Sequence, residues 1–183
     1  MLSYARKHPI LFPAAVTASV LAAQACSSTD TVTFDLEKMG VGDDRISLAV
    51  ELPNDWTELS TSGSSAVGSS RPPSVDEHDF EDLHIAYRFC PDSDDDAEAA
   101  FQACVASVFE SAHGESIDGA ERESLDGGRE WVKKDLEDSD ELAATFYISV
   151  DGGENIVTCG ARFVEHKNLA STYREVCETV EVD

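Results

Sequence analysis

The chain of 183 residues has 37 acidic and 13 basic side chains, which gives a formal net charge of −24. This charge argues against a nucleic-acid-binding protein, because phosphate backbones are bound by Lys and Arg. It argues equally against a folded domain that lies on an anionic membrane leaflet. We therefore expect no nucleic-acid partner, and an unidentified protein partner for which charge complementarity favours a cationic surface.

Residues 1–25 have the three parts of an export signal. A positively charged start is followed by a mostly apolar stretch, residues 10–23, and small residues then precede Cys26. The apolar stretch is too short for a transmembrane helix, which needs about 20 residues. The sequence therefore predicts a signal peptide that is removed, leaving 158 residues (183 minus 25) with a formal charge of −26 (11 minus 37).

Two kinds of cleavage fit the end of this signal. Ala23-Gln24-Ala25 suits ordinary secretory cleavage, and the same residues followed by Cys26 resemble a bacterial lipobox, whose cysteine is acylated. The chain has five cysteines, and an odd cysteine in an oxidising compartment requires an explanation. We therefore expect palmitate-type lipidation of Cys26, a tether over residues 26–30, and anchoring to a bacterial membrane on the periplasmic or cell-surface face. A protein secreted without an anchor is the alternative.

The first half of the remaining chain indicates strands. Alternating apolar residues predict a hairpin of strands over 32–36 and 46–52, and a third strand over 83–89. Between them, residues 60–74 read STSGSSAVGSSRPPS. A segment of this composition buries too little apolar surface to offset its ordering entropy, so we expect a flexible loop.

The second half indicates both helices and strands. An acidic run ends at Asp96, apolar residues follow at helical spacing, and Gly114 is a natural stop, so a helix is predicted between them. The further predicted elements are strands over 116–124 and 129–136, a hairpin of 142–150 with 157–163, a helix over 169–176 and an edge strand over 178–182. The fold class is therefore α+β: one domain over 31–183, with an antiparallel sheet of six or seven strands and two helices packed on it.

Spacing favours one pairing of the remaining cysteines. From Cys159 to the end of its strand is about 17 Å at 3.3 Å per residue, and a following helix returns about 15 Å by Cys177. The same arithmetic, with an extended connection of about 16 Å and a helical return of about 12 Å, brings Cys90 level with Cys104. We therefore expect disulfides Cys90–Cys104 and Cys159–Cys177. Metal ligation by these cysteines is the competing interpretation, but no CxxC pair is present.

The strongest candidate for chemistry is a short acidic stretch. HDFEDLH, residues 78–84, places His78, Glu81 and His84 within seven residues, and imidazole and carboxylate together can bind zinc. No GxSxG elbow, phosphate loop or SxxK motif accompanies it. We therefore expect a non-enzymatic binding or assembly protein with no resident cofactor and no metal site. The alternative is a secreted metal-dependent hydrolase that uses these three residues.

One stretch resembles a known family. ISLAVELPNDW, residues 46–56, is similar to the opening strand and Pro-x-x-Trp turn of PsbP-like domains. The same likeness extends to LAATFYISVDGGENIVTCGARF and LASTYREVCETVEV, the final hairpin, helix and strand. The resemblance implies an αβα-type sheet and a relationship to binding or assembly proteins, among them photosystem subunits, a nuclear-import factor and bacterial lipoproteins. It assigns no site residue, since a fold does not fix a function.

Overall fold

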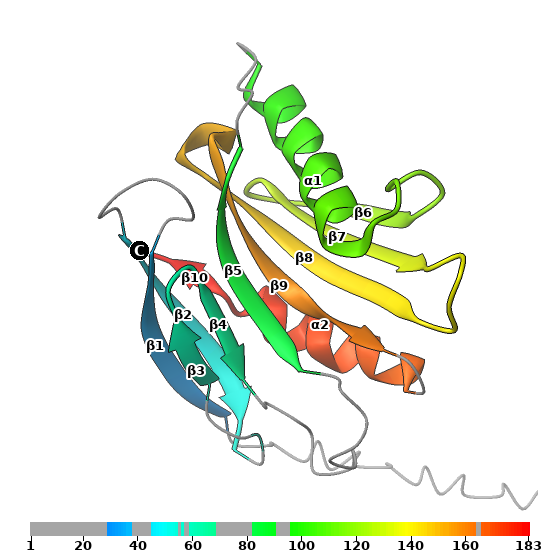
Figure 1. Ribbon diagram of the computed structural model, residues 1–183. Coiled ribbons are helices and arrows are strands. Elements are labelled where there is room, and N and C mark those ends of the chain that lie inside the picture. The colour runs from blue at the N-terminus through cyan, green and yellow to red at the C-terminus, as the bar shows by residue number, and fades with distance from the viewer. Residues whose placement is uncertain are drawn as a thin grey trace, which may run out of the picture.

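The computed structural model describes residues 29–37, 45–54, 56, 59–68, 82–90, 96–163 and 166–183. The predicted signal peptide, Cys26, His78 and Glu81 lie outside the described residues. The described strands form two antiparallel sheets, and two α-helices pack against them (Figure 1). The α+β class predicted from the sequence is confirmed.

The smaller sheet has three strands in the order β1-β2-β10. Its strands are β1 (Thr29–Glu37), β2 (Arg45–Pro53) and β10 (Glu181–Val182). Strands β1 and β2 pair from Thr29 opposite Pro53 to Glu37 opposite Arg45, so the predicted first hairpin is confirmed. Every second residue of β2 from Ile46 to Leu52 is buried, as the alternating sequence requires.

The larger sheet has seven strands in the order β3-β4-β5-β9-β8-β7-β6. Its strands are β3 (Leu59–Ser62), β4 (Ser65–Gly68), β5 (Leu83–Phe89), β6 (Glu121–Leu125), β7 (Arg129–Asp135), β8 (Leu142–Val150) and β9 (Asn155–Phe163). Strands β8 and β9 pair along their whole length around a 3₁₀ turn, η1 (Asp151–Gly153), as the sequence predicts.

Helix α1 (Ala97–His113) covers part of one face of the larger sheet (Figure 1). Asp96 caps its start, with the carboxylate accepting a hydrogen bond of 3.0 Å from the backbone N–H of Glu98. Gly114 ends it in the left-handed conformation, with φ of 74°. A stripe of side chains at 3–4 spacing is buried against the sheet: Ala100, Phe101, Cys104, Val105 and Phe109.

Helix α2 (Ala170–Glu178), preceded by a 3₁₀ turn η2 (Lys167–Leu169), lies on the opposite face of the larger sheet (Figure 1). The smaller sheet shares that side, and together they enclose the larger hydrophobic core. In it, the ring centroid of Tyr173 lies 5.1 Å from that of Trp56, in a tilted arrangement, and 5.0 Å from that of Phe163, edge to face. The order β8, β9, α2, β10 is the one that the resemblance to PsbP-like domains implies.

Each helix is joined to a strand by a disulfide. Cys90, just after β5, is bonded to Cys104 of α1, with Cα atoms 5.4 Å apart. Cys159 of β9 is bonded to Cys177 of α2, with Cα atoms 5.5 Å apart. The pairing is the one that the spacing arithmetic predicts.

Two expectations about the sheets were wrong. The sequence predicts one sheet, but β2 has β1 and β10 as its neighbours and so belongs to a second sheet. Alternating apolar and polar residues indicate a strand, but they do not indicate which strand it pairs with. The second error concerns residues 60–74, predicted as a flexible loop. Residues 59–68 form the β3–β4 hairpin, because β4 pairs with β5 and so satisfies its backbone through the sheet rather than through apolar burial. Residues 69–74 lie outside the described residues.

Two boundaries also differ. β1 begins at Thr29, so the last two residues of the predicted tether, 26–30, belong to the domain. The strand predicted over 116–124 begins only at Glu121. Before it, the chain turns: Ser116 accepts a hydrogen bond from the backbone N–H of Asp118, and Gly119 adopts a φ of +78°.

Candidate binding site

Helix α1 leaves a part of the sheet face beside it uncovered. The even-numbered residues of β5 and β9 face this side, and the odd-numbered residues face the larger core. Strand register lines up small residues across the sheet: Ala86 lies opposite Thr158, and Gly160 lies opposite Thr145. Because these side chains are short, they leave a hollow where bulky ones would fill the space.

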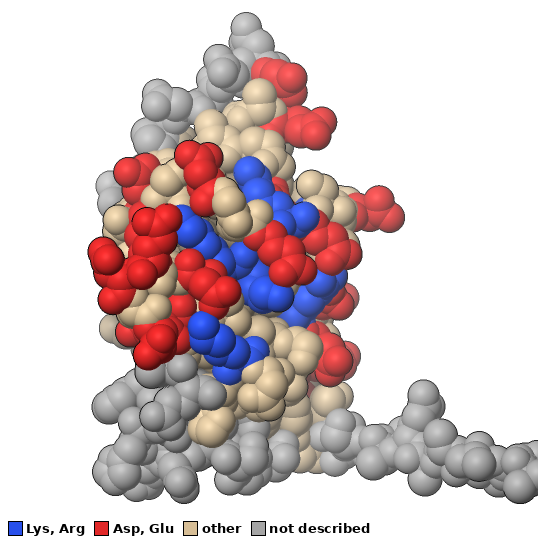
Figure 2. All heavy atoms as spheres, turned by 90° about the vertical axis from the view of Figure 1, so that its right-hand side faces the viewer, with Lys and Arg blue, Asp and Glu red and all other residues tan. Residues whose placement is uncertain are grey.

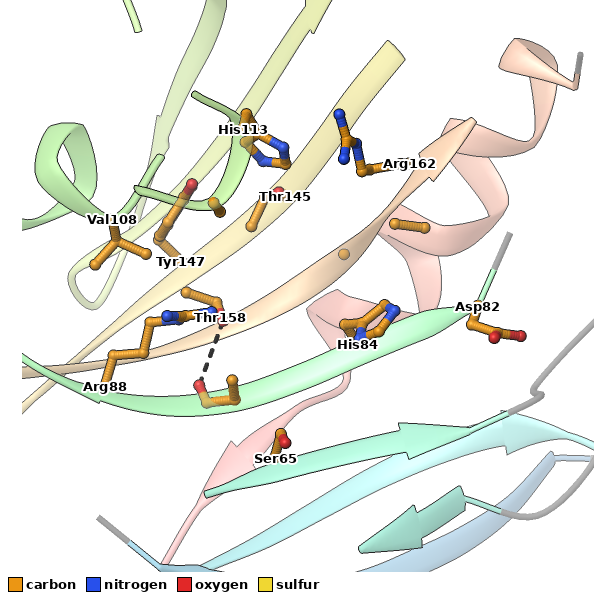
Figure 3. A pocket seen from close by; sticks show the side chains of 14 residues that line it. Ser65, Asp82, His84, Arg88, Val108, His113, Thr145, Tyr147, Thr158 and Arg162 are labelled. Atoms are coloured by element: carbon orange, nitrogen blue, oxygen red, sulfur yellow. Dashed lines mark hydrogen bonds between the residues drawn. The ribbon is translucent and has the colours of Figure 1, made fainter. Parts of the chain in front are cut away.

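This hollow is a cavity of about 470 Å³, called here the sheet cavity. Its walls come from β4, which contributes Ser65, from β5, β8 and β9, and from the last turns of α1 (Figure 3). Val108 and Ala112 of α1 form an apolar side, together with Tyr147 of β8. Burial raises the pKa of Tyr147, so its phenol stays neutral at physiological pH.

Gly160 lies in the floor of the sheet cavity, at a position where no side chain fits. A Cβ atom at this position would lie 2.3 Å from the carbonyl oxygen of Ala144 and 2.7 Å from the Cα of Thr145. Both of those atoms belong to the neighbouring strand β8, which cannot move aside without breaking its pairing with β9. Only glycine therefore fits between the two strands here.

Basic and imidazole side chains surround the cavity: His84 and Arg88 from β5, His113 from α1 and Arg162 from β9 (Figure 3). We call these four residues the rim of the cavity. Asp82, at the start of β5, adds one carboxylate to the lining. A cluster with this excess of nitrogen donors is unusual in a chain with 37 acids and 13 bases, and it favours a ligand that carries negative charge.

The two arginines of the rim differ in their partners. Arg162 forms an ion pair of 2.7 Å with Glu141, so its charge is neutralised within the protein. Arg88 forms no ion pair or hydrogen bond with any described residue, and its Nε atom is buried without a partner. Arg88 is therefore the rim's uncompensated cation.

His113 is neutral at physiological pH. Its pKa is lowered from 6.5 to about 4, chiefly by burial and also by the nearby positive charges of Arg162 and Arg88, against an opposing effect of Glu115. Its ring is tilted against that of Phe109, with the centroids 4.6 Å apart, and its Nδ1 atom is buried without a hydrogen-bond partner. It therefore adds a polar atom to the rim without adding charge.

Most of the other described basic side chains gather on one face, over β6, β7 and α2, with acidic side chains among them (Figure 2). Ion pairs with N–O distances of 2.5–3.3 Å neutralise them: Arg122–Glu130, Lys133–Glu121, Lys134–Glu115, Lys167–Asp135 and Arg174–Glu123. Arg129 instead donates hydrogen bonds to the backbone carbonyls of Glu178 and Val180. This face is therefore not a surface for a polyanion.

Of the residues singled out in the sequence, His84 lies in the sheet cavity, whereas His78, Glu81 and Cys26 lie outside the described residues. In the described part of the chain, no three His, Cys, Asp or Glu side chains form a group suited to a metal ion. Among the same residues, no helix has the length and apolar run of a membrane span. The sequence alone does not indicate Arg88, His113 or Arg162 as site residues. In the sequence, the polar residues Asp82, His84 and Arg88 alternate with apolar ones. This pattern is the same as that of a strand whose polar side faces solvent, so it does not indicate a site.

Comparison with known proteins gives a likeness of fold. No family model and no curated protein matches the chain. A crystal structure of the Ran-binding protein Mog1p of Saccharomyces cerevisiae is similar, with 14% sequence identity and a TM-score of 0.45, over 83% of this chain and 96% of that one. A likeness of this degree carries no function from one protein to the other.

Proposed function

We propose that this protein is a membrane-tethered, extracytoplasmic binding or assembly lipoprotein without enzymatic activity, and that the sheet cavity is where it binds a small molecule. The observation that carries the proposal is the cavity itself. Its volume of about 470 Å³ falls among those of small-molecule sites, and it combines apolar walls with a few convergent polar groups.

The cysteines support the location. Two disulfides between strands and helices persist in an oxidising compartment, such as the periplasm or the cell exterior. They use four of the five cysteines, and the remaining one is Cys26, at the position a lipid anchor would take. The expected site of the protein is thus the cell envelope.

The groups in the cavity support binding rather than catalysis. A general base works best with a pKa near the operating pH, and His113 has a pKa of about 4. The hydroxyl of Ser65 donates to the backbone carbonyl of Ser62, 3.4 Å away, rather than to an imidazole. Within the described lining, no hydroxyl is therefore paired with a histidine in the manner of an activated nucleophile.

A cavity-filling variant tests the binding site. Ala112 is exposed on α1 and lines the cavity, so Ala112→Trp fills the space without disturbing the sheet. Ala103, exposed on the same helix and away from the cavity, gives the matched control Ala103→Trp. We expect the fluorescent neutral probe N-phenyl-1-naphthylamine to bind the wild type and Ala103→Trp, and to bind Ala112→Trp at least tenfold more weakly. Equal binding by all three proteins would refute the site.

The anchor has its own test. Cells that express the wild type or Cys26→Ser are labelled with a palmitate analogue, and the protein is then isolated. Labelling of the wild type alone is the expected result. Equal labelling of both proteins would show that Cys26 does not carry the lipid.

A further inference from the structure

We propose that the ligand of the sheet cavity is a small organic monoanion, whose single carboxylate-type group binds Arg88 while its apolar body lies along α1. This inference rests on the proposed binding function and names the chemical class of the ligand. Three observations support it: the unpartnered Nε of Arg88, the size and apolar lining of the cavity, and the number of charges around it.

The first step is the unsatisfied guanidinium. Among the described Lys and Arg side chains, Arg88 alone has neither an ion pair nor a hydrogen bond, and its Nε is buried. A buried donor without a partner destabilises the fold, all the more when it is charged. Arg88 as a whole is half-buried, so a ligand can approach the rest of its planar guanidinium, against which a carboxylate can place both oxygen atoms.

The second step is the size and the lining of the cavity. A volume of about 470 Å³ is far larger than a single inorganic anion needs. Val108 and the ring of Tyr147 lie on the Arg88 side of the cavity (Figure 3), and Ala112 adds another apolar side chain to the lining. Apolar contact of this kind favours a ligand with a hydrocarbon or aromatic body.

The third step is the number of charges. Arg162 is already neutralised by Glu141, so among the described arginines of the lining Arg88 alone has no carboxylate partner to balance it. The formal net charge of −24 repels every further negative charge. One anionic group is therefore favoured over a phosphate dianion. His113 is neutral here and adds no positive charge to the cavity.

Two fluorescent probes of the same shape, one anionic and one neutral, separate the contribution of charge to binding from that of shape. 8-Anilinonaphthalene-1-sulfonate is a monoanion, and N-phenyl-1-naphthylamine is the same body without the sulfonate. Both are titrated by fluorescence into the wild type, Arg88→Gln and the control Arg45→Gln, whose arginine is exposed and paired with Glu37 at 2.8 Å. We expect Arg88→Gln to weaken binding of the anionic probe at least tenfold and that of the neutral probe less than twofold, because a charge-assisted pair is worth about a factor of ten or more.

Competition identifies the anionic group. Octanoate should displace the anionic probe from the wild type, and inorganic phosphate at the same concentration should not. Displacement by phosphate alone would overturn the choice of a monoanion with an apolar body. Circular dichroism and the urea midpoint check the fold of each variant. If Arg88→Gln does not fold, Arg88→Lys takes its place, for which we expect retained but weakened binding, since the charge stays and the planar fork is lost.

The outcomes distinguish this inference from the function it rests on. If Arg88→Gln binds the anionic probe as tightly as the wild type does, the assignment of Arg88 is wrong. Binding of the neutral probe that is lost in Ala112→Trp would still support the cavity as a binding site. If neither probe binds the wild type, the proposed function fails, and the inference fails with it.

Discussion

Removal of the Cys159–Cys177 disulfide should destabilise the domain more than removal of Cys90–Cys104. The perturbation is the double variant Cys159→Ala/Cys177→Ala, compared with Cys90→Ala/Cys104→Ala. The bridges have sequence separations of 18 and 14 residues, so loss of chain constraint alone costs about 3 kcal/mol for each. Loop length therefore does not separate the two variants.

Packing separates them. All four cysteines are buried, but Cys159 and Cys177 lie in the larger core and Cys90 and Cys104 in the smaller one. The Cys159–Cys177 bridge also holds α2, a helix of nine residues, and the short strand β10 that follows it. Loss of the two buried sulfur atoms adds about 1–2 kcal/mol, because the core around them relaxes only in part. The expected totals are about 4–5 kcal/mol for this pair and about 3–4 kcal/mol for the other.

Urea unfolding of both variants, followed by circular dichroism, measures the two free energies. Wild-type protein treated with a reductant is the control for the loss of both bridges without substitution. Equal or greater destabilisation in Cys90→Ala/Cys104→Ala would refute the reasoning from burial and from the attachment of α2. A loss below about 1 kcal/mol in Cys159→Ala/Cys177→Ala would mean that the bridge does not constrain the chain.

Three further predictions follow from single features. Gly160→Ala should cost about 3 kcal/mol in urea unfolding, because its Cβ would overlap the backbone of β8; a loss below 1 kcal/mol would contradict the close approach. The pKa of His113 is lowered from 6.5 to about 4, so the unfolded chain takes up the proton first, and the stability present above pH 6.5 is lost as the pH falls through 4. In His113→Gln, the decrease in the free energy of unfolding between pH 6.5 and pH 4 should be smaller by about 1–2 kcal/mol, after allowance for solvent screening. Urea unfolding at several pH values measures it, and the same pH dependence in both proteins would refute the prediction. Purified protein should contain no stoichiometric zinc; zinc that is lost in His78→Ala/His84→Ala would instead favour the hydrolase.

The elements that the sequence predicts well are those whose signals are local. Asp96, the apolar spacing of α1 and Gly114 all lie within one segment, so the helix and both its ends can be inferred without knowledge of the fold. The β3–β4 hairpin is the opposite case. Its polar residues form strands because β4 pairs with β5, where Ser65 lies opposite Ala86, about 20 residues later in the chain. The composition of the hairpin itself does not indicate that partner.

The sheet cavity could not be predicted for a related reason. Arg88 alternates with buried residues of β5, which indicates a side chain in solvent. Its place in a cavity depends on the register that aligns Ala86 with Thr158, and on α1 ending beside the strand instead of over it. Of the rim, the sequence indicates only His84, and it does so as a candidate zinc ligand.

The central claim is that a small molecule binds in the sheet cavity. Native mass spectrometry of protein isolated from its own cell envelope tests this most directly, with Ala112→Trp and Ala103→Trp expressed in the same cells. The account predicts one bound small molecule on the wild type and on Ala103→Trp, and none on Ala112→Trp. The same bound mass on Ala112→Trp would contradict it, since the filled cavity would then not be where the molecule binds.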